Sequence, residues 1–161
     1  MKLLLSPEGN TLVGLIRREI GMGIERRISI LKAAAFLLLI GPGVMMVVSP
    51  IAPTLVFIEA FLDFAFQPLD GGQKITGGAA LLLNAILGGI LVGFGALIWL
   101  VADRVFRHDQ AAGRTILLVS IGSWFVCDSA GSVLAGAWFN AVINIAILAV
   151  FLTPLLWPAG D

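Results

Sequence analysis

The fold is decided by residues 115–157, TILLVSIGSWFVCDSAGSVLAGAWFNAVINIAILAVFLTPLLW. This run has no lysine or arginine, and it contains one carboxylic acid, Asp128, and two amides, Asn140 and Asn144. A helix needs about 20 apolar residues to cross a bilayer, so the run is long enough for two crossings. We therefore expect an antiparallel pair of membrane helices at about 115–135 and 137–157, joined by a short turn at Gly136.

The composition of the whole chain also indicates a membrane protein. Of its 161 residues, 59% are hydrophobic and 12% are charged, whereas a soluble domain carries roughly 25% charged residues. The chain has too little polar surface to cover a globule in water, and it is too hydrophobic to remain disordered. We predict an all-α integral membrane protein with a single four-helix bundle at residues 28–161.

Two further apolar stretches, at about 28–48 and 75–102, supply the first and second spans of this bundle. The first contains Gly41-Pro42-Gly43, where we expect a kink because proline removes a backbone hydrogen bond. The second is rich in glycine, and it is followed by a charged segment at 103–114 that we expect to be a loop.

A short apolar helix is predicted at about 53–66, after the break at Ser49-Pro50. It is too short to span a bilayer and is expected to lie at the interface. Glu59 and Asp63 are four residues apart, so they share one side of this helix and form an outer acidic face. This face is either solvated or folded over the polar cluster described below.

Residues 1–27 are the least hydrophobic part of the chain. Leu12, Ile16, Ile20 and Ile24 recur every four residues among basic side chains, which predicts an amphipathic helix on the cytoplasmic membrane surface. The alternative is a partly ordered, solvated tail.

The distribution of basic residues predicts the orientation of the spans. Nine of the ten lysines and arginines fall before or inside the first span, or between the second and third spans, and Lys74 alone falls on the other side. Positive residues accumulate on the cytoplasmic side of membrane proteins. We therefore expect both termini in the cytoplasm and four spans through the membrane.

A cluster of polar residues is expected within the bilayer. Counting from the turn places Asp128, Asn140, Asn144 and Asn84 at a similar depth, with Ser132 one helical turn from Asp128. Polar groups in hydrocarbon are costly, so they should face inward and pair. One interpretation is a structural clamp between helices. The other is a ligand or proton site with Asp128 as its titratable member.

Small residues form two faces on the predicted spans. Such faces allow close approach of membrane helices, either inside the bundle or against a partner or a second copy. They consist of Gly88, Gly89 and Gly93 in the second span and of Ser123, Cys127 and Gly131 in the third.

The sequence lacks the residues that several kinds of chemistry require. Cys127 and His108 are single, so the chain offers no paired-cysteine redox motif and no histidine within a span to ligate haem. Metal-ligand spacings and phosphate-binding loops are also missing from the sequence, and its basic residues are too dispersed for nucleic acid. We expect no cofactor and no catalytic activity.

Three motifs resemble the DoxX-like four-helix bacterial membrane proteins. They are the break at Ser49-Pro50, the glycine-rich segment 87–95, and a third and fourth span carrying the segment 124–129 with Asn140 and Asn144. The resemblance implies a four-helix bundle in a bacterial inner membrane, and it transfers no activity or catalytic residue.

Two functions are consistent with these features. The first is a non-catalytic accessory or assembly subunit of an energy-transducing membrane complex, docked to a protein partner through its small-residue faces. The alternative is a small-solute or proton-coupled transporter, or a ligand-binding protein, that uses the cluster around Asp128. Lipid surrounds the chain in either case, and a lipid or quinone bound in a groove would be compatible with both.

Overall fold

The structure, a computed structural model, describes residues 23–157, which are all-helical and contain no strand. Four helices are long and apolar enough to cross a membrane, as predicted. Most of the amphipathic helix predicted at residues 1–27 lies outside the described residues. In chain order the helices are α2 (Ile24–Ala35), η1 (Phe36–Ile40), α3 (Gly41–Val48), α4 (Leu55–Phe66), α5 (Gly78–Leu100), η2 (Val101–Phe106), α6 (Gln110–Leu134) and α7 (Trp138–Leu156).

The first long helix is continuous through α2, η1 and α3, and it contains a wider π-helical turn at η1. Pro42 lies two residues after Ile40, the last residue of this turn. Because proline cannot donate a backbone hydrogen bond and its ring crowds the preceding turn, a wider turn accommodates it. A kink was expected at Gly41-Pro42-Gly43, and the structure has a π-helical turn that ends just before these residues.

The prediction that residues 103–114 form a loop is wrong in its extent. The second long helix continues through η2, and α6 begins at Gln110. Asp103 makes ion pairs with Lys32 and Arg107, so the charged turn of η2 stays helical beside the first helix. Asp109 then caps α6 by accepting a hydrogen bond from the Ala112 backbone amide.

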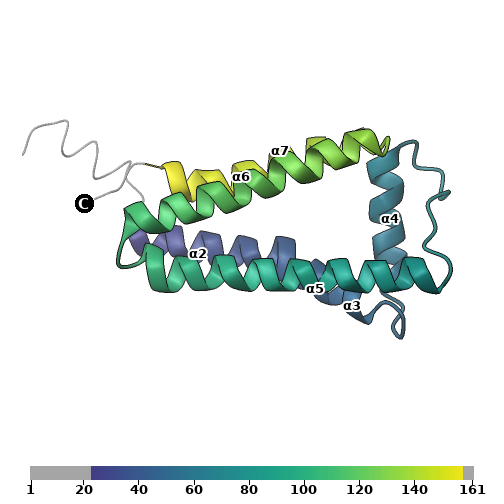
Figure 1. The fold of residues 1–161 in the computed structure, drawn as a ribbon, viewed down its shortest axis with the longest axis horizontal. Helices are drawn as coiled ribbons and strands as arrows, with labels where there is room; N and C mark the ends of the chain where they lie inside the picture. Colours follow the sequence, from purple (N-terminus) through teal and green to yellow (C-terminus); the bar gives the residue numbers. More distant parts are fainter. Residues whose placement is uncertain (1–22, 158–161) are drawn as a thin grey trace, which may run out of the picture.

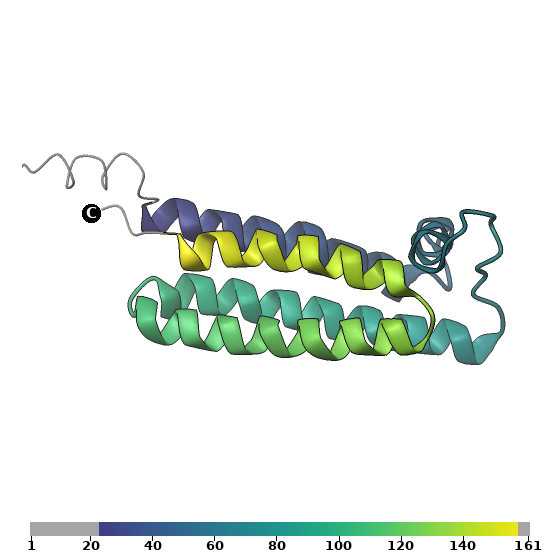
Figure 2. The ribbon, with the colours of Figure 1, turned by 90° about the horizontal axis from the view of Figure 1, so that it is seen from above.

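The helices form two layers that diverge along the molecule. Figure 1 shows α6 and α7 in one layer and α2, α3 and α5 in the other, with α4 lying across the end where the layers separate. Figure 2 shows that α2 runs beside α7 at the opposite end, where η2 packs against α6. We call the opposite end the basic end, because it carries Arg27, Lys32, Arg104, Arg107 and Arg114, and we call the other the α4 end.

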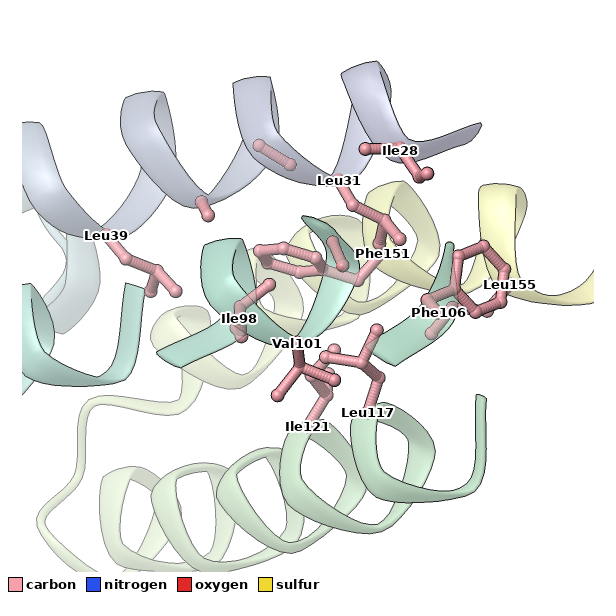
Figure 3. Packing of buried hydrophobic residues seen from close by; sticks show 13 residues of the cluster. Ile28, Leu31, Leu39, Ile98, Val101, Phe106, Leu117, Ile121, Phe151 and Leu155 are labelled. Atoms are coloured by element: carbon pink, nitrogen blue, oxygen red, sulfur yellow. The ribbon is translucent and has the colours of Figure 1, made fainter. Parts of the chain in front are cut away.

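The buried hydrophobic core lies toward the basic end (Figure 3). Close van der Waals packing between these side chains holds the helices together. The largest fully buried apolar side chains are Ile28, Leu31, Ile98, Phe106, Leu117, Ile121, Phe151 and Leu155.

Close contact between α3 and α5 depends on Gly43 and Gly88. A Cβ atom added at Gly88 would lie 2.6 Å from the Gly43 carbonyl oxygen, and one added at Gly43 would lie 2.7 Å from that of Gly88. Gly88 therefore packs inside the bundle, which is one of the two roles expected for the small residues of the second span.

Candidate functional site

The candidate site is a polar cluster between α6 and α7. The Nδ2 atoms of Asn144 and Asn140 both donate to Oδ2 of Asp128, at 2.6 and 3.2 Å. Asn144 also donates to the Ser129 hydroxyl at 3.1 Å, and Asn140 donates to the Ser132 hydroxyl at 2.8 Å. The structure thus brings together four of the predicted residues and adds Ser129, which lies beside Asp128 in the sequence.

The tight turn between α6 and α7 sets the register of this cluster. Gly136 has a φ of +85°, a conformation that side chains other than glycine rarely adopt. Asp128 precedes Leu134, the last residue of α6, by six positions, and Asn144 follows Trp138, the first residue of α7, by six. At 1.5 Å per residue, both lie about 9 Å from the turn, which is why they meet.

Asp128 is exposed although it lies on the core-facing side of α6. It is seven residues beyond Ile121 and eleven beyond Leu117, so all three share one side of the helix. Leu117 and Ile121 are fully buried by the neighbouring helices, whereas Asp128 lies where the two layers have diverged. Only 11% of the most apolar stretch of α6 is buried, against 28% in each of the first two long helices.

Among the described residues, hydrogen bonds reach only one oxygen of the Asp128 carboxylate. Both amides donate to Oδ2, and among residues 23–157 no hydrogen bond reaches Oδ1. The cluster therefore holds the carboxyl group in place, and Oδ1 remains able to bond to a molecule that packs on this part of α6.

Asn84 lies elsewhere, contrary to the prediction that it joins the cluster. Its Nδ2 donates to the Ser49 hydroxyl at 2.8 Å and to the Met46 carbonyl at 3.2 Å, and its side chain is buried. At this depth α5 packs against α3, so the Asn84 side chain meets the end of α3. Asn84 thus stabilises the C-terminal end of α3.

Glu59 and Asp63 do not form a solvated acidic face. Glu59 accepts hydrogen bonds from the Ile75 backbone amide and from Lys74, both at 3.1 Å, and these two donors, the amide first, lower the pKa of its carboxyl. Asp63 is buried and accepts from the Gly71 backbone amide at 3.0 Å. Both carboxylates hold the segment 67–77 against α4, and neither hydrogen-bonds to the Asp128 cluster.

The remaining small residues face outward. In the described structure, apart from the adjoining residues and backbone of the same helix, no atom lies within 4 Å of the position that a Cβ would take at Gly89, Gly93 or Gly131. Ser123 and Cys127 are exposed on α6 as well. These residues are available to a neighbour from outside the chain.

The basic end contains a buried arginine, Arg27, from the segment that was predicted to lie on the membrane surface. Arg27 is fully buried, and its guanidinium donates to the carbonyls of Pro154 and Leu155 and to Gln110. Pro154 lies inside α7, near its C-terminus. Free carbonyls at a helix C-terminus attract cations, and this rule was the available signal for Arg27.

Comparison with protein-family models, curated proteins and solved structures finds no match for the chain. Residues 23–157 contain no group of three or more histidine, cysteine or acidic side chains that could hold a metal ion.

Proposed function

We propose that the chain is a non-catalytic accessory or assembly subunit of a bacterial, energy-transducing membrane complex. In this proposal its four long helices cross the inner membrane, and a helix of a partner protein docks on the α4-end half of α6. The observation that carries the proposal is the exposed Asp128 on an uncovered side of an apolar helix.

The cost of a polar group in hydrocarbon supports a docked partner. An acidic side chain near the centre of a membrane helix costs about 2.5–3.5 kcal/mol on insertion scales. Lipid tails offer Asp128 Oδ1 no hydrogen bond, whereas a polar side chain on a partner helix does. Cys127 and Gly131 are small and lie beside Asp128 on α6, so a second helix can approach its backbone closely.

The proposed orientation places the basic end in the cytoplasm. The described cations gather at that end, while Lys74, Glu59, Asp63 and Asp70 lie at or near the α4 end. This asymmetry supports cytoplasmic termini through the positive-inside rule. The bacterial inner membrane is proposed from the resemblance to DoxX-like proteins alone.

The native Cys127 provides a direct test. A photoreactive maleimide is attached to Cys127 in native membranes, and the control carries Cys127→Ser with Val133→Cys, because Val133 is exposed and lies about 120° or more around α6 from Cys127, Asp128 and Gly131. We expect one protein of defined mass to crosslink at Cys127 and to co-purify in fixed stoichiometry. Gly131→Leu should abolish that stoichiometric complex.

Two results would contradict the proposal. One is a pattern in which both attachment sites react with lipid alone. The other is a monomer in mild detergent whose behaviour is the same with glycine or leucine at position 131.

A transporter is the second candidate, and the geometry of Asp128 favours it. Two amides hold its carboxyl through a single oxygen, so the other oxygen remains free to take up a proton or a cation. Vesicles loaded with a pH-sensitive dye and reconstituted with the protein should then dissipate a pH gradient. Asp128→Asn should remove that flux, and equal flux from both proteins would eliminate the transporter.

A further inference from the structure

A groove of about 640 Å³ runs along the basic end, between α2 and the second long helix. It opens onto the outside of the bundle. It lies at the basic end, whereas the Asp128 cluster lies toward the α4 end. Its lining includes the polar residues Glu25, Ser29, Lys32 and Arg107 and the aromatic residues Phe36 and Trp99.

The residues of the first long helix, from α2 into η1, change character in order along this groove. Glu25, Ser29, Lys32 and Phe36 are spaced by four, three and four residues, so they share one side of the helix. The groove thus passes from an acid at the end of the helix, through a hydroxyl and a cation, to an exposed aromatic ring. At 1.5 Å per residue this gradient covers about 16 Å.

The charges in the groove balance one another. Lys32 Nζ lies 3.1 Å from Asp103 Oδ1 and 4.5 Å from the centre of the Trp99 ring. Arg107 pairs with Asp103 at 3.3 Å and also with Glu25. Two cations, Lys32 and Arg107, and one carboxylate, Glu25, therefore line the groove. Asp103 is not part of the lining but pairs with both cations, and Arg104 beside it is mostly exposed. A ligand with a single negative charge would meet cations that already have carboxylate partners.

We propose that this groove binds a phospholipid with a phosphoethanolamine headgroup. The lipid phosphate lies between Lys32 and Arg107 and accepts a hydrogen bond from the Ser29 hydroxyl. The lipid ammonium group reaches Glu25, and an acyl chain passes over Phe36. The order ammonium, phosphate and acyl chain matches the order acid, cation and aromatic ring along α2 and the start of η1.

Other headgroups fit the groove less well. Phosphatidylcholine carries the same charges, but its trimethylammonium group has no N–H to donate to Glu25. Phosphatidylglycerol has no cation to place there. Trp99 suits the level of a lipid headgroup, because tryptophan prefers the membrane interface. The inference rests on the chain crossing a bilayer, as proposed above, and it is independent of any partner at Asp128.

Native mass spectrometry of the delipidated protein tests this inference. The protein is titrated with dioleoyl phosphatidylethanolamine, phosphatidylcholine and phosphatidylglycerol, which share their acyl chains. We expect one bound phosphatidylethanolamine at concentrations where the other two give only nonspecific adducts. Lys32→Gln should weaken this binding roughly tenfold or more, because it removes a charge-assisted contact to phosphate. Lys74→Gln is the control, since Lys74 is also ion-paired but lies toward the α4 end.

A second variant separates headgroup recognition from folding. Glu25→Gln should leave phosphate binding intact and remove the preference for phosphatidylethanolamine over phosphatidylcholine, and Glu25 is exposed enough to be replaced without disturbing the core. The inference is overturned if phosphatidylglycerol binds wild type as tightly as phosphatidylethanolamine, or if both lysine variants behave alike. A failed crosslink at Cys127 would leave these results unaffected, so the two proposals fail separately.

Discussion

Replacing Arg27 by methionine should destabilise the bundle more than any other single loss of charge among the described residues. Its Nε donates to the Pro154 carbonyl at 2.6 Å, its Nη2 to the Leu155 carbonyl at 3.2 Å and its Nη1 to Gln110 Oε1 at 3.0 Å. The guanidinium also lies 4.9 Å from the centre of the Phe106 ring. One side chain therefore joins the starts of α2 and α6 to the end of α7.

The expected loss is about 3–5 kcal/mol in the free energy of unfolding. Hydrogen bonds from charged donors contribute about 1.5–3 kcal/mol each, and a desolvated cation–π contact contributes about 2 kcal/mol. Removing the buried charge recovers part of its desolvation cost, which brings the net loss close to that of a broken buried ion pair. Arg27→Lys should lose about 1–3 kcal/mol, because an ammonium group keeps the charge but lacks the fork of the guanidinium.

Reversible unfolding in mixed micelles, followed by tryptophan fluorescence, measures these differences. Arg26→Met is the matched control, since Arg26 is the exposed neighbour and the change in charge and size is the same. The reasoning is refuted if Arg27→Met and Arg26→Met lower the unfolding free energy equally. It is also refuted if lysine at position 27 is as damaging as methionine.

Two further predictions concern packing and pH. Gly88→Leu should cost about 1–3 kcal/mol or more in the same assay, because its Cβ would overlap the Gly43 carbonyl, whereas Gly89→Leu should change stability little. Glu59 has a folded pKa below its ordinary value of 4.5, so its contact with Ile75 is complete above pH 4.5 and is lost as pH falls through the lower folded pKa. The amide NMR signal of Ile75 should therefore titrate with a midpoint below 4.5, and a midpoint at or above 4.5 would contradict the assignment.

Depth within the bundle could be predicted from the sequence. In a pair of membrane helices joined by a tight turn, the distance of each residue from the turn follows from counting at 1.5 Å per residue. This counting brought Asp128, Asn140 and Asn144 to one level, and the structure places them in hydrogen-bond contact. The positive φ of Gly136 keeps the turn short enough for the count to hold.

Which neighbours a residue meets at a given depth could not be predicted in the same way. Asn84 belongs to a helix whose neighbour at that level is α3, so its amide meets Ser49 and not Asp128. Depth counting gives a height along the bundle but no angular position around it. The burial of Asp63 depends on segment 67–77 folding back over α4, and that segment has no helical periodicity from which its path could be inferred.

The two ends of the bundle need different neighbours, and this difference connects the two proposals. At the basic end, Lys32, Arg107 and their carboxylate partners are already paired, and the surface between them is graded from polar to apolar as a lipid is. At the α4 end, α6 separates from α5, and Asp128 keeps an oxygen without a hydrogen bond from the described residues. Lipid tails can fill the space beside an apolar helix, but they cannot satisfy a carboxyl group. We therefore expect lipid headgroups to be selected at the basic end and a protein helix or water at Asp128.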